Sequence, residues 1–241
     1  MQGDRMKTDI IECEEGKFSV ISNDAIADRI KSSGWWEKHF SAVCLLIREG
    51  AVAIDGGANF GYNAVVMAKR VGVSGKVLCF EPQPIMYDRL KENFPLNGLT
   101  NGDLRMQALW DNNCMLKIPS LTGHGEGLVN YGGVRVGRGV SCEAVTIDSL
   151  RIHRLDFLKL DLEGEEARAI RGGMGTIRRF MPVMHIEYDR NLQGSSTEAL
   201  ELCKALGYRV YHISTDYPSD HLCMPPGDER HEQLGLVLTP V

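Results

Sequence analysis

The chain lacks a long hydrophobic run, since no stretch approaches the roughly 18 apolar residues that a membrane-spanning helix requires. Its first residues also lack the apolar core of a secretion signal. Its seven cysteines are dispersed without Cys-x-x-Cys spacing, which argues against a disulfide framework and a zinc site. We therefore expect a cytoplasmic protein with reduced thiols and no membrane partner.

An excess of positive charge is also absent. The net charge of −5 argues against a nucleic-acid partner, because phosphates are held by a concentrated basic surface. Four arginines do cluster, but their spacing suits the solvated face of a helix: Arg168, Arg171, Arg178 and Arg179. Hydrophobic and charged contents of 43% and 24% are ordinary for a globular protein, and 241 residues allow one large core.

A glycine-rich turn organises the chain. An apolar run that ends in Asp55 predicts a buried strand, and residues 62–70 predict a helix. Gly57, Asn59 and Gly61 lie in the turn between them. Glycines let a ligand approach bare backbone, and the helix start offers free N–H groups and a positive dipole end. The turn is predicted to bind a cofactor, and a purely structural turn is the alternative.

The order of residues in this turn separates two classes of cofactor. A dinucleotide fingerprint reads Gly-x-Gly-x-x-Gly, but here the order is Asp55-x-Gly57-x-x-x-Gly61. This order resembles motif I of the class I S-adenosylmethionine (SAM) methyltransferases. An acid suits SAM better than a pyrophosphate, because SAM is positively charged at its sulfonium and its ammonium.

The second and third strands predict the rest of a nucleoside site. Residues 76–80 predict a strand that ends in Glu81, one βαβ unit after the first acid. An acid in this position is where the paired hydroxyls of a ribose are held. A third strand is predicted over residues 104–109, and it would place Gln107 and Ala108 near the adenine.

Three more acids are expected at the same edge of the sheet. Asp161 and Glu163 follow a strand predicted over residues 156–161, and Glu187 ends a strand predicted over residues 182–187. Because neighbouring parallel strands end at one edge, these acids converge on the cleft, and we predict that they are catalytic. Alternatively, Asp161 or Glu163 holds the SAM ammonium or caps a helix. A divalent metal on all three is disfavoured, since no neutral ligand accompanies them.

Two further polar residues lie inside the predicted strands. Lys159 needs a carboxylate partner, either Asp161 or Glu187, and a structural ion pair is favoured over a contact with substrate. His185 could be a base, but a core histidine is the favoured interpretation.

Residues 112–148 interrupt the alternation of strands and helices, and residues 119–139 within this stretch contain seven glycines. A segment of this kind is often a lid or a substrate loop. The predicted substrate contacts there are His124, Asn130 and Tyr131, and Trp36 is a further one ahead of the glycine turn.

The element order predicts an α/β fold with a mostly parallel, seven-stranded, Rossmann-like sheet. Strands predicted over residues 208–213 and 234–238 have no room for a full helix between them. They are therefore expected to form an antiparallel pair at one edge.

Four sequence blocks narrow the resemblance to one family. IDGGANFGYNA, VLCFEPQP, FLKLDLEGEEARAIRGG and PVMHIEYD resemble the signature blocks of the FkbM-type methyltransferases. The resemblance implies SAM as cofactor and methylation of hydroxyl oxygens on natural products and sugars. It places Glu37, which follows an aromatic residue, among the cofactor contacts, whereas Gly56 departs from the usual aliphatic residue. Residues 1–50 are then an N-terminal helical cap, and residues 51–241 the SAM-binding methyltransferase domain.

The sequence thus predicts an O-methyltransferase with a small-molecule or saccharide acceptor. An NAD(P)-dependent oxidoreductase is disfavoured by the acid that precedes the glycines. A non-catalytic partner protein of the same fold is disfavoured by the acids at the strand ends.

Overall fold

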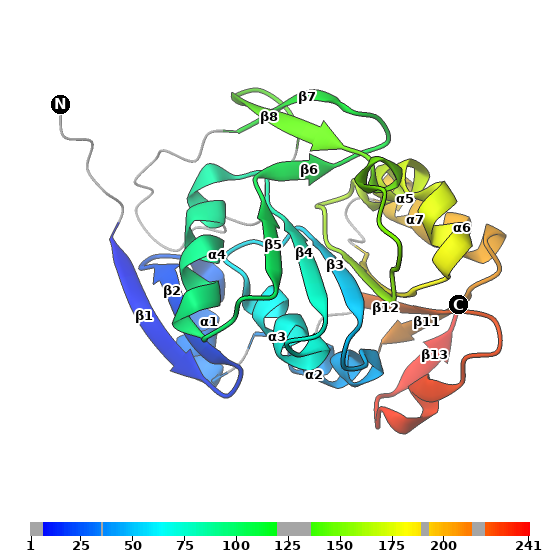
Figure 1. Ribbon diagram of the computed structural model, residues 1–241, viewed down its shortest axis with the longest axis horizontal. Coiled ribbons are helices and arrows are strands. Elements are labelled where there is room, and N and C mark those ends of the chain that lie inside the picture. Colours follow the sequence, from blue (N-terminus) through cyan, green and yellow to red (C-terminus); the bar gives the residue numbers. More distant parts are fainter. Residues whose placement is uncertain (1–6, 35, 120–135, 189–192, 214–219) are drawn as a thin grey trace.

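A central sheet with helices on both faces forms the body of the protein (Figure 1). The computed structural model describes residues 7–34, 36–119, 136–188, 193–213 and 220–241. The eight strands of the sheet follow the order β13-β11-β12-β10-β9-β3-β4-β5. Their bounds are β3 Val52–Gly56, β4 Lys76–Phe80, β5 Gly102–Arg105, β9 Phe157–Leu160, β10 Val183–Glu187, β11 Arg209–Ile213, β12 Asp220–Met224 and β13 Leu238–Pro240.

The predicted α/β class with a mostly parallel sheet is confirmed. Strands β5, β4, β3, β9 and β10 pair in parallel, so their carboxyl ends meet at one edge. Strand β12 is antiparallel to both β10 and β11, and the outer pair β11–β13 is antiparallel as expected.

The side of the sheet formed by the last strands of the chain contains one strand, β12, that was not predicted from the sequence. Every residue of β12 is buried, and its polar first residues Asp220 and His221 hide it from a search for apolar runs. The strand predicted over residues 234–238 was placed too early. Leu234 instead packs into the core after the 3-10 turn η4 (Arg230–Gln233), and Val237 is exposed.

Successive side chains of the strands point to opposite faces of the sheet and pack into two hydrophobic cores. In β3, Ala53 joins the core under the first group of helices, and Ile54 joins the core under the second. The first group is α1 (Ala25–Ser33), α2 (Lys38–Val43), η1 (Cys44–Leu46), α3 (Tyr62–Val71) and α4 (Pro84–Leu96). The second is η2 (Ile147–Leu150), α5 (Glu166–Gly172), α6 (Met174–Phe180) and α7 (Gln193–Ala205). Among the described helices, none is both long and apolar enough to cross a bilayer.

The N-terminal segment contains a β-hairpin ahead of its helices. Strands β1 (Thr8–Cys13) and β2 (Gly16–Ile21) pair antiparallel. Phe18 of β2 packs on the rings of Phe60 and Tyr62, at centroid distances of 6.0 and 5.2 Å. The hairpin therefore shares its core with the glycine turn and α3.

A small second sheet lies above the carboxyl edge of the main one (Figure 1). It has the order β6-β8-β7, with β6 Gln107–Leu109, β7 Cys114–Ile118 and β8 Val140–Val145. The single strand predicted over residues 104–109 is thus wrong. The chain leaves the main sheet at the exposed Met106, and Gln107 pairs with Glu143 of β8.

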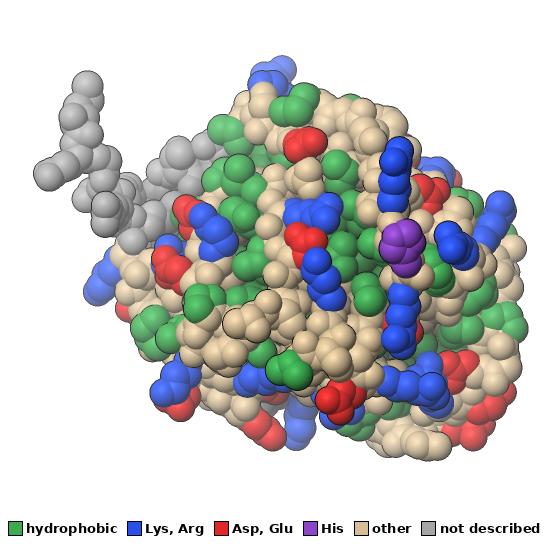
Figure 2. Space-filling view, viewed as in Figure 1, with side chains coloured by type: hydrophobic (Ala, Val, Ile, Leu, Met, Phe, Trp, Pro, Cys, Tyr) green, Lys and Arg blue, Asp and Glu red, His purple; other side chains and the backbone are tan. Residues whose placement is uncertain are grey.

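The clustered arginines lie on a solvated helix surface, as expected. On the face in Figure 2, basic and acidic side chains are interspersed. Arg168 is paired with Asp111 at 2.7 Å and with Glu165 at 3.1 Å, and Arg171 is paired with Glu198. Pairing of this kind between exposed side chains contributes little to stability.

Candidate functional site

The glycine turn presents bare backbone at the end of β3. Gly57, Asn59 and Gly61 all have positive φ angles, of 77°, 52° and 96°. A Cβ atom on Gly57 would lie 1.8 Å from the carbonyl oxygen of Asp161, so no other residue fits there without moving backbone. A Cβ on Gly56 would meet the side chains of Leu109 and Leu160 at about 3 Å. These leucines occupy the space that an aliphatic residue would need.

Glu81 is held rigidly at the end of β4. Its Oε2 accepts the N–H of Asn59 at 2.7 Å, and its Oε1 accepts the N–H of Gln83 at 2.8 Å. Burial raises the pKa of Glu81 to about 7, although these two hydrogen bonds oppose the shift. The carboxyl group is therefore fixed in place and titrates near neutrality.

Three of the predicted acids come together at the ends of β9 and β10. Carboxylate oxygens of Asp161, Glu163 and Glu187 lie within 4.8 Å of one another. The charge of Asp161, together with burial, raises the pKa of Glu187 well above its usual value. Glu163 has a φ of 55°, a left-handed conformation that is uncommon for a residue with a side chain. We call these three residues the acidic cluster.

Lys159 is buried beneath the acidic cluster and pairs with two acids. Its Nζ lies 3.1 Å from Oδ2 of Asp161 and 3.5 Å from Oδ1 of Asp55. Burial alone would lower the pKa of Lys159, but the carboxylates of Asp161, Asp55 and Glu37 together raise it. The lysine therefore stays charged and holds Asp161 in place. This is the structural ion pair that the sequence favoured, with Asp55 as a second partner.

Glu37 approaches the same cavity from the segment before α2. Its Oε2 accepts a hydrogen bond from Nδ2 of Asn63 at 2.8 Å, and burial raises its pKa to about 7. Asn63 was missed by the sequence reasoning, although its place in the first turn of α3 puts it beside the glycine turn. Trp36 donates its backbone N–H to the hydroxyl of Tyr62 at 3.2 Å.

Two adjoining cavities share Gly57, Glu81, Asp161 and Glu163. The larger one, of about 200 Å³, is also lined by Ile26, Trp36, Glu37, Ala58, Asn59, Phe60, Tyr62, Asn63, Lys159 and Glu187. The smaller one, of about 60 Å³, is also lined by Phe80, Pro82, Gln83, Gln107, Ala108, Leu109, Trp110, Ile118, Val136, Leu162 and Glu165. One cavity thus has polar, acidic walls and the other has mainly apolar walls.

A few predicted site residues lie elsewhere. Asp55 and Gly61 line neither cavity: Asp55 is fully buried under Lys159, and Gly61 faces Leu90. His124, Asn130 and Tyr131 fall outside the described residues. Burial lowers the pKa of His185 to about 4, which makes this residue a poor base and agrees with a core position.

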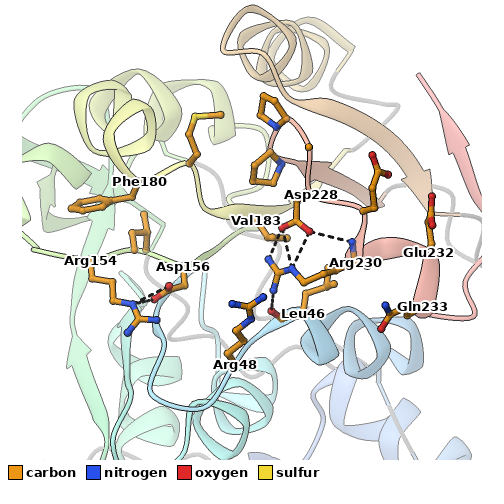
Figure 3. A pocket seen from close by; sticks show the side chains of 16 residues that line it. Leu46, Arg48, Arg154, Asp156, Phe180, Val183, Asp228, Arg230, Glu232 and Gln233 are labelled. Carbon is orange, nitrogen blue, oxygen red and sulfur yellow. Dashed lines mark hydrogen bonds and ion pairs between the residues drawn. The ribbon is translucent and has the colours of Figure 1, made fainter.

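A cavity of about 640 Å³ opens at the opposite edge of the sheet, where β9 and β10 begin (Figure 3). Two of the arginines that line it are paired with acids: Arg154 pairs with Asp156 at 2.7 Å, and Arg230 pairs with Asp228 at 2.5 Å. Arg230 also donates to the carbonyl of Leu46 at 2.8 Å. Ligands of open parallel sheets bind at the carboxyl ends of the strands, so we assign the site to the two smaller cavities.

The chemistry of these cavities fits SAM. The larger cavity is lined by five acids and one lysine, which suits a cationic ligand. Gly57, Ala58 and Asn59 of the glycine turn line the larger cavity, and the buried carboxyl group of Glu81 lies beside them. The apolar walls around Ala108 and Leu162 suit an adenine ring.

Comparison with known proteins gives consistent results. The model of the methyltransferase FkbM domain matches residues 55–210. Methyltransferase sdnD of Sordaria araneosa is 28% identical over 153 residues, which cover 49% of this chain and 59% of the relative. The crystal structure of methyltransferase FkbM from Methylobacillus flagellatus KT superposes with a TM-score of 0.52 at 17% identity, over 73% of this chain and 43% of that one. The chain therefore spans only part of the length of these relatives. The structural likeness confirms the predicted Rossmann-like fold of class I methyltransferases.

Proposed function

Because this chain belongs to the FkbM methyltransferase family, whose cofactor is SAM, we propose that it methylates a hydroxyl group of a small molecule or saccharide. One observation carries the proposal. The acidic cluster stands at the strand ends beside the glycine turn, in the wall of the cavity that fits the cofactor. A hydroxyl acceptor and a base can therefore meet where the donor methyl arrives.

Different residues of the chain bind different parts of the cofactor in this proposal. Glu81 would accept hydrogen bonds from the ribose hydroxyls of bound SAM, and Gln107 and Ala108 would contact the adenine. Glu37 and Asn59 line the larger cavity and would contact the methionine moiety. When bound, SAM supplies a methyl group on a sulfonium, which an in-line nucleophile can displace. The acids around that position favour the positive charge of the donor.

Proton removal is the part of the reaction that the protein must perform. An alcohol has a pKa far above neutrality, so a base must take its proton as the new C–O bond forms. Glu187 faces the cavity next to Asp161 and Glu163, and we assign it as the base. Lys159 pairs with Asp161 and so holds that neighbour in place. Glu163 orients the acceptor hydroxyl.

The ribose assignment predicts a loss of affinity in Glu81→Ala. Without the carboxylate, the ribose hydroxyls lose their acceptor and the N–H groups of Asn59 and Gln83 lose theirs. Orphaned polar groups cost about 1–3 kcal/mol, so calorimetry with S-adenosylhomocysteine should show roughly tenfold to hundredfold weaker binding. The exposed Glu201→Ala is the matched control and should bind as the wild type does. Unchanged affinity in Glu81→Ala would contradict the assignment.

The same residue predicts a pH dependence of binding. Ribose hydroxyls bond more strongly to an ionised carboxylate than to a protonated one. Since the pKa of Glu81 is about 7 in the free protein, binding of S-adenosylhomocysteine should be strongest above pH 7. It should weaken by up to about tenfold for each pH unit below 7. In Glu81→Gln, which does not titrate, the affinity should be lower and this dependence lost; a dependence that persists would assign it to another group.

A labelled-methyl screen tests the function itself. The purified protein is incubated with methyl-labelled SAM and panels of sugars, polyketides and small peptides, and the products are analysed by mass spectrometry. We expect the label on a hydroxyl oxygen of a sugar or polyketide. Label on nitrogen or carbon would contradict O-methylation, and tight cofactor binding without transfer to any panel would favour a non-catalytic role.

A further inference from the structure

A second polar cluster lies next to the acidic cluster but lines neither cofactor cavity. It consists of His39 from α2, His185 from β10 and Asp220 from β12. One ligand atom from each residue lies within 4.8 Å of the other two. In the register of β10 and β12, Asp220 stands opposite Glu187. Helix α2 and strands β10 and β12 meet only in the folded protein, so no local sequence pattern indicates this group.

His185 is a buried polar side chain without a hydrogen-bond partner among the described residues. Its side chain is 2% exposed, and neither ring nitrogen has a hydrogen-bond partner among the described residues. Its Nε2 faces Oδ1 of Asp220 at 3.8 Å, which is too long for a hydrogen bond. A buried imidazole in this state is costly, and native structures ordinarily satisfy such groups.

The distances within the cluster suit three ligands of one ion. Nε2 of His39 lies 2.6 Å from Oδ2 of Asp220, and the two side chains form an ion pair when the imidazole is protonated. Two ligands that each bind one ion at about 2.0–2.1 Å stand about 2.9–3.4 Å apart. The observed 2.6 and 3.8 Å bracket this separation, so small side-chain movements would bring the three atoms around one centre.

We propose that His39, His185 and Asp220 bind one divalent transition-metal ion. Two imidazoles and one carboxylate are the donor set of several zinc and non-haem iron sites. The ion satisfies the buried His185 and links α2, β10 and β12 beside the cleft. Because the three side chains are at most 11% exposed, the ion acts on the position of these elements and not directly on the acceptor.

The test uses zinc and cobalt with the whole chain. Protein freed of metal by a chelator is titrated with Zn²⁺ by calorimetry and with Co²⁺ by visible absorption. We expect one ion per chain at the proposed site, and a Co²⁺ spectrum without the thiolate charge-transfer band that cysteine ligands would add. His39→Ala and Asp220→Asn should each weaken binding at least about tenfold. The exposed His153→Ala should leave it unchanged.

Two controls make each outcome decisive. Binding of S-adenosylhomocysteine shows that each variant is folded, and His39→Ala decides the question if Asp220→Asn does not fold. Glu163→Gln and His231→Ala test the two other groups that could hold an ion. The proposal is overturned if folded wild-type protein binds neither ion up to about 1 mM, or if His39→Ala binds as the wild type does. It is also overturned if only Glu163→Gln or His231→Ala removes the binding.

Discussion

Replacing Glu187 by Gln is expected to lower the rate of methyl transfer by at least about a hundredfold, while the affinity for SAM changes little. A positioned base contributes about 10²–10⁴ in rate, and the amide cannot accept the proton of the acceptor hydroxyl. Glu163→Gln should have a similar effect, because it belongs to the same acidic cluster. Asp161→Asn should reduce both rate and affinity, since it also loses the ion pair with Lys159.

Single-turnover kinetics beside direct cofactor binding measure these effects. Glu201→Gln, an exposed acid on α7, is the matched control and should react as the wild type does. If Glu187→Gln stays active, the base assignment is wrong, and if Glu163→Gln stays active as well, positioning alone drives the reaction. Activity that disappears with a chelator and in Glu163→Gln, but not in His39→Ala, would point instead to a metal on the acidic cluster.

The second large effect is expected at the glycine turn. Gly57→Val should abolish measurable binding of S-adenosylhomocysteine, because the new Cβ would overlap the carbonyl oxygen of Asp161 at 1.8 Å. The backbone on both sides of the cavity must then move, and the positive φ of 77° adds strain for a β-branched residue. Calorimetry measures the affinity, and circular dichroism shows that the variant is folded.

Gly98→Val provides the comparison for this variant. Gly98 also has a positive φ, of 68°, but a Cβ there meets nothing within 4 Å. It should therefore carry a similar conformational cost and still bind the cofactor. Wild-type affinity in a folded Gly57→Val would contradict the place given to the turn in the cofactor site.

The parts of the site that the sequence predicted share a local origin. The glycine turn and the strand that ends in Glu81 are each encoded by fewer than about fifteen consecutive residues. Within each segment, the local signals for strand, turn and helix agree. Parallel strands end at one edge of the sheet. The proximity of Asp161 and Glu187 can therefore be predicted from their positions at the ends of two such strands. That is why the convergence of the three acids was predicted correctly, whereas their catalytic role stays a prediction.

The parts that were missed depend on distant contacts. Strand β12 is recognised only through its pairing with β10 and β11, since its polar first residues resemble a loop. The pairing also creates the contact between His39 and Asp220, which are far apart in sequence. Likewise, the break in the strand at Met106 follows from the pairing of β6 with β8. The strand propensities of the single residues do not indicate this pairing. Strand pairing in the folded protein therefore determines the structure of these segments, which local sequence patterns do not indicate.

A crystal structure with S-adenosylhomocysteine tests the central claim most directly. The claim is that the cavities between the glycine turn and the acidic cluster hold the cofactor with its sulfur toward Asp161, Glu163 and Glu187. We predict ribose hydroxyls on Glu81, adenine beside Ala108, and the sulfur within reach of an acceptor oxygen that also contacts Glu187. A ligand found in the cavity lined by Arg154 and Arg230, or one whose sulfur faces away from the acidic cluster, would contradict the account.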